Sequence, residues 1–252
     1  MSVRTGNSVV RGLGLAFVVV ALFVLALTSA VPAGEGNADN PGILPPGSNA
    51  YGQSYAEWSV AWWQWVWSLP ATGHPLFDMT GESAGNGQSG HVFFLGGLLG
   101  RSGAVERTIT VPCGKPLFFP VLNIHVNNIG RPVPRTIEQM YARAQQFMDS
   151  ITDPYATVDG VAVNNLSAYR VVSPVYSIWL PATDNVYQTV FHINVSGTFS
   201  PAISDGLYLM LAPLSVGEHV VTFGGTAGGP PYGTTPWSLN VTYNITVEPG
   251  KK

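Results

Sequence analysis

The chain of 252 residues has few charges and a single cysteine. Charged side chains make up 10% of the sequence, and the formal net charge at pH 7 is −3. The sequence has no basic patch to follow a phosphate backbone, so nucleic acid is not an expected partner. Because Cys113 stands alone, no disulfide can form within the chain. We expect this cysteine to be a small buried hydrophobic side chain.

Long apolar runs are also scarce, and the only one spans residues 13–27, "LGLAFVVVALFVLAL". Two arginines precede it and small residues follow it. This order predicts a secretory signal peptide over residues 1–33, cleaved after Ala30 or Ala33, and therefore a secreted or periplasmic protein. The alternative is a retained anchor over residues 12–33, because ~17–25 apolar residues span a bilayer. No later segment is apolar enough, so no membrane contact is expected after cleavage.

Residues 34–50, "GEGNADNPGILPPGSNA", are rich in Gly, Pro and Asn and predict a flexible lead-in. Residues 51–252 are then expected to form a single β-rich domain. A chain of this size buries ~70% of its unfolded surface when it folds. It therefore needs no disulfide or metal for stability, and no cofactor is expected.

Tryptophan, by contrast, is concentrated, and five of the seven lie in "WSVAWWQWVW", residues 58–67. Ser54 and Glu57 form a capping-box pattern before this stretch, which predicts a helix over residues 55–68 that begins the domain. At ~100° per residue, one face of this helix is aromatic and is predicted to be core. That face carries Trp58, Trp62 and Trp65.

Trp63 and Trp67 lie one turn apart on a second face of the predicted helix. Either a second layer of the protein covers them or a partner does. A strand is the alternative for this segment, and it would place Trp63, Trp65 and Trp67 ~6.6 Å apart along one flat face. The capping box and the Ala, Glu and Gln content favour the helix.

A second helix is predicted over residues 137–150. Apolar residues recur there at i, i+3, i+4 and i+7, and Thr136 with Gln139 forms another capping box. The opposite face is polar, which indicates a helix on the surface of a core.

The rest of the sequence predicts short strands separated by Gly and Pro turns. They are expected near residues 91–95, 106–111, 116–122, 156–163, 171–180, 186–195, 207–211, 219–223 and 239–247. Asp159 and Gly160 stand between two apolar runs, which is typical of a two-residue hairpin. The predicted fold class is therefore mainly β, a β-sandwich or jelly-roll-like domain with two packed α-helices.

Four segments carry a resemblance to known sequences. They are "AWWQWVWSLP", "HPLFDMTGESAGNGQSGHVFFLGG", "RTITVPCGKPLFFPVLN" and "DGLYLMLAPLSVGEHVVTFGG", in this order. In these segments the chain resembles a group of uncharacterised secreted bacterial proteins. The resemblance implies secretion and a shared fold, and it implies no activity.

The loop at residues 72–91 is one candidate site. His74, Asp78, Glu82 and His91 lie in it, and long loops without regular structure are often functional. Imidazole and carboxylate groups together can exchange protons or bind a metal, so these four are catalytic candidates. The alternative is a polar loop whose Asx turns bond to its own backbone.

Two further histidines are weak metal candidates. His125 and His219 lie at strand ends, and histidines from separate strands of a jelly roll can converge on one metal. The linear cupin pattern of two histidines followed by a glutamate is absent, so no metal site is assigned.

Surplus aromatic residues are the candidates for ligand binding. They are Trp63, Trp67, Tyr232 and Trp237. We expect a secreted, non-catalytic binding protein whose exposed aromatics contact a carbohydrate or another cell-envelope ligand. One alternative is a structural envelope protein or oligomer in which the same tryptophans bury against a partner. The second alternative is a hydrolase or metalloenzyme that uses the loop at residues 74–91.

Overall fold

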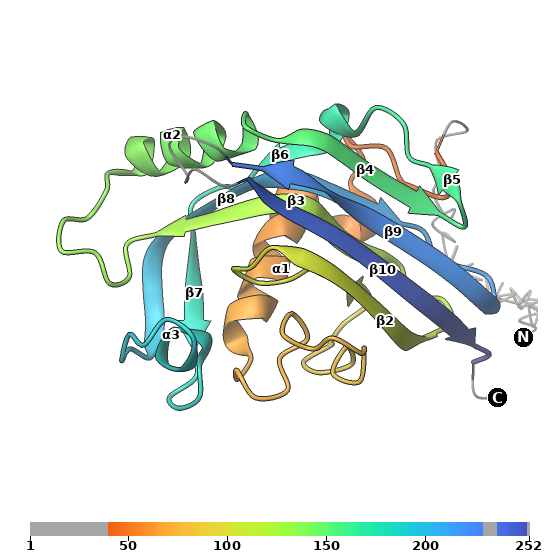
Figure 1. Ribbon diagram of the computed structural model, residues 1–252, viewed down its shortest axis with the longest axis horizontal. Helices are drawn as coiled ribbons and strands as arrows, with labels where there is room; N and C mark the ends of the chain where they lie inside the picture. Colours follow the sequence, from red (N-terminus) through yellow and green to blue (C-terminus); the bar gives the residue numbers. More distant parts are fainter. Residues whose placement is uncertain (1–39, 229–235, 251–252) are drawn as a thin grey trace, which may run out of the picture. The chain divides into compact units, whose positions relative to one another are not determined.

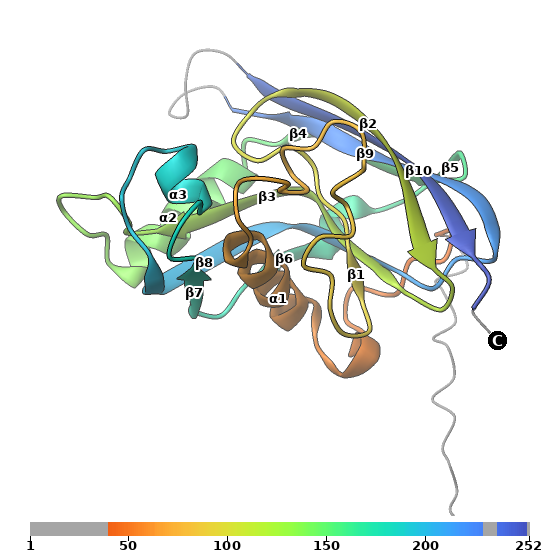
Figure 2. The same cartoon turned by 90° about the horizontal axis from the view of Figure 1, so that it is seen from below.

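Two β-sheets stack on one another, and a helix covers the outer face of one of them (Figures 1 and 2). This computed structural model describes residues 40–228 and 236–250. The predicted fold class, mainly β with packed helices, is confirmed. The sandwich is asymmetric, because among the described helices only α1, at Tyr55–Ser68, lies on the outer face of a sheet.

The first sheet has the strand order β1-β3-β8-β6, and β7 also pairs with β8. Its strands are β1 (Phe93–Phe94), β3 (Leu117–Asn127), β6 (Arg170–Val172), β7 (Tyr176–Leu180) and β8 (Gly197–Leu211). The second sheet has the order β2-β10-β9-β4-β5. Its strands are β2 (Gly103–Pro112), β4 (Thr152–Val158), β5 (Val161–Ala162), β9 (Gly217–Ala227) and β10 (Trp237–Glu248). β10 runs parallel to β2 and antiparallel to β9, so this sheet is mixed.

Both predicted helices are confirmed. The described helices are η1 (Ala50–Gly52), α1 (Tyr55–Ser68), α2 (Ile137–Met148), η2 (Leu166–Tyr169) and α3 (Val186–Thr189). Both capping boxes are formed, one between Ser54 and Glu57 and one between Thr136 and Gln139. Helix α1 packs against one face of the first sheet, and α2 packs against β3 and β8 on the other face (Figure 1).

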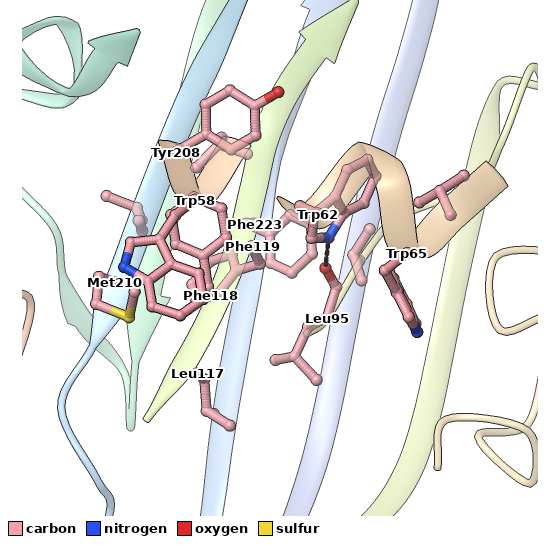
Figure 3. Close-up of a cluster of buried hydrophobic side chains, with 14 of the residues drawn as sticks. Trp58, Trp62, Trp65, Leu95, Leu117, Phe118, Phe119, Tyr208, Met210 and Phe223 are labelled. Carbon is pink, nitrogen blue, oxygen red and sulfur yellow. Dashed lines mark hydrogen bonds between the residues drawn. The ribbon is translucent and has the colours of Figure 1, made fainter. Parts of the chain in front are cut away.

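The aromatic face of α1 is core, as predicted. Trp58, Trp62 and Trp65 are buried, and Figure 3 shows them against the aromatic residues of the first sheet. Trp62 Nε1–H donates to the carbonyl of Leu95 at 2.7 Å, and Trp58 Nε1–H donates to the carbonyl of Ala50 at 2.8 Å. Burial of these indoles is compatible with their polar atoms because each N–H has an acceptor.

The second face of α1 is also buried, which corrects the expectation that Trp63 and Trp67 are exposed. Each retains only 4% of its accessible surface. A second layer of the protein covers them, since His125, Tyr187 and Tyr208 contact their rings or bond to them. The strand alternative for this segment is wrong, because residues 55–68 are helical.

The main core lies between the two sheets. Phe119 of β3 stacks on Phe223 of β9 with ring centroids 4.9 Å apart, and Phe223 contacts Tyr243 of β10. The alternation predicted for the last strand is confirmed, because every second side chain of β10 from Leu239 to Val247 is buried. This period of two gives β10 one face in the core and one in solvent.

The hairpin at Asp159 and Gly160 is confirmed. It joins β4 to β5, and both residues have positive φ angles, 51° and 77°. The strand expected over residues 186–195 is wrong, because α3 begins there. Asn185 caps α3, with its side chain accepting from Gln188 N–H and the Gln188 side chain accepting from Asn185 N–H. A capping box therefore overrides the β-branched composition of this segment.

Two further expectations need correction. Residues 40–50 are not a loose lead-in: Ile43 is buried and bridges to Leu211, and Leu44 N–H donates to the Met210 carbonyl. Cys113 is exposed rather than buried, because it lies in the turn between β2 and β3.

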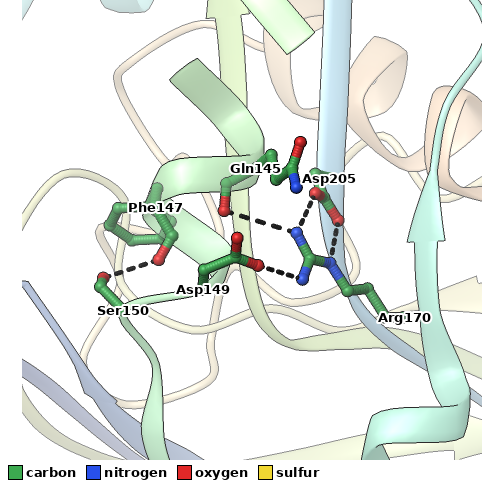
Figure 4. A network of polar contacts seen from close by, with 6 residues as sticks. All are labelled: Gln145, Phe147, Asp149, Ser150, Arg170 and Asp205. Atoms are coloured by element: carbon green, nitrogen blue, oxygen red, sulfur yellow. Dashed lines mark hydrogen bonds and ion pairs between the residues drawn. The ribbon is translucent and has the colours of Figure 1, made fainter. Parts of the chain in front are cut away.

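An ion-pair network joins α2 to the first sheet (Figure 4). Arg170 of β6 donates through two nitrogens to both carboxylate oxygens of the buried Asp205 in β8, at 3.1 and 2.7 Å. Its third nitrogen donates to Asp149, the C-cap of α2, at 2.6 Å. Bidentate arginine pairs of this kind fix geometry as well as charge, so the network holds α2 in place over β3 and β8.

Residues 1–33, the predicted signal peptide, lie outside the described residues. Of the helices that the structure describes, none is long and apolar enough to cross a membrane.

Candidate functional site

A cavity of about 610 Å³ lies at one edge of β3. Its walls come from the C-terminal half of α1, from β3, from α2 and α3, from Gly228 just after β9, and from the start of β10. These elements are far apart in the sequence but gather around β3 (Figure 2). A volume of this size is within the range of small-molecule sites.

The cavity exists because β3 has a free edge. β1 pairs only with Leu117 and Phe118, so within the described residues the rest of that edge has no strand partner. Eight consecutive residues from Pro120 to Asn127 line the cavity. A strand contributes consecutive residues when it presents its edge, because its side chains alternate between faces. Pro120 fits such an edge, since proline has no N–H to donate to a neighbouring strand.

Aromatic rings form one wall of the cavity. Trp63 and Trp67 stack with ring centroids 5.7 Å apart and an interplanar angle of 13°. His125 contacts both indoles, at 4.9 and 5.1 Å, and Tyr187 contacts Trp67 at 5.1 Å. Trp237 also lines the cavity and is half-buried. Three of the four predicted ligand-binding aromatics thus line one cavity, although two of them expose only a narrow strip to it.

The polar groups of this wall are held in one hydrogen-bond chain. Ile129 N–H donates to Asn127 Oδ1 at 2.9 Å, which turns the Asn127 amide nitrogen toward His125 Nε2 at 2.8 Å. That amide nitrogen also donates to the Tyr187 hydroxyl. His125 Nε2 is therefore an acceptor, and its Nδ1–H donates to the Tyr176 hydroxyl at 2.7 Å. The chain fixes the histidine as the neutral Nδ1–H tautomer.

His125 is half-buried and lines the cavity. Burial lowers the pKa of His125 to about 3. Desolvation disfavours the imidazolium, and protonation of Nε2 would also break the bond from Asn127. The ring is thus a neutral, fixed part of the wall, with both nitrogens already engaged.

Tyr208 completes the polar floor beneath Trp63. Its hydroxyl accepts from Trp63 Nε1–H at 3.1 Å and from the Asn123 amide at 3.2 Å. Burial raises the pKa of Tyr208 to about 12, so the hydroxyl stays protonated. Asn123 lines the cavity in turn, which places its amide where a ligand can meet it.

One buried donor at the cavity has no acceptor. Trp67 lines the cavity, and its indole N–H finds no hydrogen-bond partner among the residues that the structure describes. A buried donor without an acceptor costs ~1–3 kcal/mol. The other indoles of α1, those of Trp58, Trp62, Trp63 and Trp65, each have an acceptor. Among the described residues, the Trp67 N–H is thus an unpaired donor inside the wall, closed off from solvent.

Three arginines line the cavity next to α2: Arg131, Arg135 and Arg143. Asn128 fixes the connection before the helix, because its side chain accepts from Arg135 N–H at 2.8 Å and donates to the Arg135 carbonyl at 3.0 Å. None of the described residues that line the cavity is acidic. No motif in the sequence marked these arginines, although they are three of the 11 basic residues and fall within 13 residues of one another.

The loop at residues 72–91 has a structural role at His74. This side chain is buried, and its Nε2 bonds to the Val66 carbonyl at 3.0 Å while its Nδ1 accepts from Leu76 N–H at 3.1 Å. Burial lowers the pKa of His74 below its ordinary value. His74 thus links the end of α1 to the loop, and both ring nitrogens are engaged.

Asp78 organises the same loop as an Asx turn. Its carboxylate accepts from Thr80 N–H, Gly81 N–H and Ser83 N–H at 2.8 to 3.0 Å. Although burial opposes it, these bonds lower the pKa of Asp78. The carboxylate is thus occupied by the backbone of its own loop, as the alternative reading of this loop expected.

The structure does not bring the four catalytic candidates together. His74 is buried, whereas Glu82 and His91 are exposed. His74 bonds to the backbone of Val66 and Leu76, and Asp78 bonds to the loop that follows it. Neither side chain is therefore available as a partner for Glu82 or His91.

A buried arginine that the sequence did not reveal anchors this loop. Arg107 of β2 is 1% exposed and lies over the Tyr243 ring. It donates to the carbonyls of Asp78, Gly96 and Gly97 and to the Tyr243 hydroxyl, at 2.6 to 3.1 Å. Because Gly97 lines the cavity, Arg107 also positions one of the cavity's walls.

The two metal candidates do not converge. His125 belongs to the cavity wall, whereas His219 bonds to Asp159 Oδ2 at 2.8 Å in the turn region of β4 and β5. Burial works to lower the pKa of His219, but its bonds to Asp159 and to the Ser215 carbonyl raise it. In residues 40–228 and 236–250, no three His, Cys, Asp or Glu side chains are grouped as metal ligands.

Trp179 is an exposed tryptophan, and it retains 52% of its accessible surface. It lies on β7 beside a surface groove of about 660 Å³ that Gln64, His91 and Ser177 also line. The sequence did not mark it as exposed, because alternation along β7 does not say which face is covered. Tyr232, the fourth predicted ligand residue, lies outside the described residues.

Comparisons with known proteins give no family. No family model and no curated protein matches the chain. Among solved structures, the cysteine protease inhibitor EhICP2 from Entamoeba histolytica is 13% identical, with a TM-score of 0.21. The aligned part covers 62% of this chain and 94% of the inhibitor. Amebosin is 11% identical, with a TM-score of 0.22. The aligned part covers 63% of this chain and 100% of amebosin. Likenesses at these TM-scores carry no argument about fold or function.

Proposed function

We propose that this protein is a secreted, non-catalytic binding protein that holds a small carbohydrate in the cavity beside β3. The observation that carries the proposal is the cavity of about 610 Å³, whose described lining combines aromatic rings with the side-chain amides of Asn123 and Asn127. The proposal retains the predicted signal peptide and places the protein outside the cytoplasm.

The composition of the cavity supports a ligand with both polar and apolar faces. Carbohydrates present hydroxyls at their edges and C–H groups on their faces, and they pack against aromatic rings. Asn123 and Asn127 supply fixed amides, while Trp237 and Phe191 supply accessible aromatic surface. Binding sites of this kind are mostly apolar, with a few well-placed polar groups.

The proposal places the accessible aromatic contacts at Trp237 and Phe191 rather than at Trp63 and Trp67. The latter two are covered by the protein itself. Their stacked rings shape the wall and pack against His125.

The test compares tryptophans inside and outside the cavity. Binding of a panel of neutral and acidic mono- and disaccharides is measured by isothermal titration calorimetry with wild type, Trp237→Ala and Trp179→Ala. We expect Trp237→Ala to weaken binding at least ~10-fold, since loss of one aromatic contact of ~1.4 kcal/mol has this effect. Trp179→Ala is the matched control and should bind like wild type.

A second variant keeps the test decisive if Trp237→Ala unfolds. Phe191 lines the cavity but is 42% exposed, so Phe191→Ala leaves the core intact. It should weaken binding as well. Loss of binding in Trp179→Ala alone would place the carbohydrate in the groove beside β7, and no binding to any sugar of the panel would overturn the proposal.

A further inference from the structure

The cavity has a charge opposite to that of the whole chain. The formal net charge of the chain is −3, yet the cavity is lined by Arg131, Arg135 and Arg143 and by no acidic residue among those described. The histidine in the wall stays neutral. Every charged side chain among the described residues that line the cavity is thus positive.

The arginines are held at the mouth of the cavity rather than in its depth. Arg131 is exposed, and Arg135 and Arg143 are half-buried. The same three residues also line a shallow depression of about 500 Å³ on the outer surface. They therefore stand between the cavity and solvent, where a ligand entering from solvent meets them first.

Their backbone is fixed, which limits the entropy lost when a ligand binds. The side chain of Asn128 bonds to both the N–H and the carbonyl of Arg135, and Arg131 N–H donates to the Asn128 carbonyl. Arg143 projects from α2, which the Arg170 network ties to the first sheet. A guanidinium group matches the planar geometry of a carboxylate.

We propose that the ligand of the cavity is an acidic sugar, whose carboxylate bonds to the arginines at the mouth while its ring lies against the aromatic wall. This inference rests on the proposed function and adds the substrate class. The ring hydroxyls meet Asn123 and Asn127, and the carboxylate is the group that the arginines select. A neutral sugar of the same shape has no carboxylate to offer these guanidinium groups.

The test uses sugars that differ only at carbon 6. Binding of glucuronate is compared with glucose, and binding of galacturonate with galactose, by isothermal titration calorimetry with the full-length protein. We expect the acid of at least one pair to bind ~10-fold or more tightly than its neutral partner, because a hydrogen bond to a charged group is worth more than a neutral one. This preference should shrink as salt is raised, because the arginines lie near solvent.

Arginine variants decide whether the preference comes from this site. Arg143→Gln and the more exposed Arg131→Gln should each lose most of the preference for the acid and keep the affinity for the neutral sugar. Arg101→Gln, an exposed arginine that does not line the cavity, is the matched control and should behave as wild type.

The possible failures are distinct. If acid and neutral sugars bind equally in wild type, or if the preference survives in both arginine variants, the inference of an acidic ligand is wrong and the proposed function stands. If neither member of either pair binds, while other neutral sugars of the wider panel do, the inference is again wrong. If no sugar binds, the proposed function fails together with it.

Discussion

Individual side chains in this protein behave as their surroundings dictate. His125 and His219 are both histidines near strand ends, yet burial lowers the pKa of the first to about 3, while bonds to Asp159 and Ser215 raise the pKa of the second. Trp67 and Trp62 lie on one helix and are both buried, but only Trp62 has an acceptor for its N–H within the described chain. The residue type sets the chemistry available, and the neighbours decide which part of it is used.

The pKa of His125 predicts a pH dependence of stability. A histidine in the unfolded chain titrates near ~6.5, whereas folded His125 titrates at about 3. Between these values the unfolded chain binds a proton that the folded protein does not. The free energy of unfolding should therefore fall as pH is lowered from ~6.5, by up to ~1.4 kcal/mol per pH unit. Chemical denaturation of wild type and His125→Gln at pH 7 and pH 4.5 should show a smaller loss in the variant.

His219→Gln is the control, because its effect on the pH dependence of stability should have the opposite sign. Because the folded pKa of His219 is raised, its contribution to stability is present below the unfolded pKa and is lost as pH rises through the folded pKa. Wild type should therefore lose some stability as pH rises above ~6.5, and His219→Gln should not show this loss. An NMR titration that found His125 protonated at pH 5.5 would contradict the first expectation.

Capping residues decide where the helical elements begin. Three capping boxes are formed, at α1, α2 and α3, and each links an Asn, Ser or Thr to a Glu or Gln three residues later. Two were recognised in the sequence because an apolar helical repeat follows them. The third, at Asn185 and Gln188, precedes only four helical residues, and so short a helix leaves no periodicity to detect.

We expect Asn185→Ala to destabilise the protein more than Thr136→Ala does. Thr136 is exposed and its side chain accepts from Gln139 N–H, so its loss should cost ~1 kcal/mol. Asn185 is buried, and its amide also donates to the carbonyls of Pro181 and Val195. Its removal leaves those carbonyls unpaired and should cost ~2–4 kcal/mol. Urea denaturation of both variants measures the difference, and equal midpoints would contradict it.

The arrangement of the whole molecule decides whether Trp63 and Trp67 are buried or exposed. Strands of the first sheet, the segments at Asn86 and Leu95, and Tyr187 of α3 surround α1, so both of its aromatic faces are covered. The layers do not close at the edge of β3, and the cavity lies there, lined by several separate parts of the chain. Its arginines, amides and indoles come together only through this arrangement.

The tryptophan fluorescence that acrylamide quenches should therefore come mainly from Trp179. This side chain is 52% exposed, whereas Trp63 and Trp67 are each 4% exposed. Trp179→Phe should remove the largest part of the quenchable signal, and Trp63→Phe/Trp67→Phe should remove little of it. A large loss in the double variant would contradict the buried cluster. Weaker quenching of wild type at higher protein concentration would support the alternative of an oligomer that covers β7.

The sequence was sufficient where structure depends on near neighbours. The capping boxes of α1 and α2, the hairpin at Asp159 and Gly160 and the alternation of β10 each depend on residues within one element, and each is confirmed. The Asx turn of Asp78 is local too, and it was foreseen as the alternative for its loop. Burial on the helical face of Trp58, Trp62 and Trp65 followed from periodicity alone.

By itself, then, the sequence determined the mainly β class, the two longer helices and the aromatic character of the site. Only the tertiary structure decided that Trp63 and Trp67 are covered, that Arg107 is a buried anchor, and that three arginines share a cavity with His125. Local patterns set which face of an element is apolar, because that depends on the period of the chain. What lies against that face depends on contacts between residues far apart in sequence, and no local period encodes those contacts.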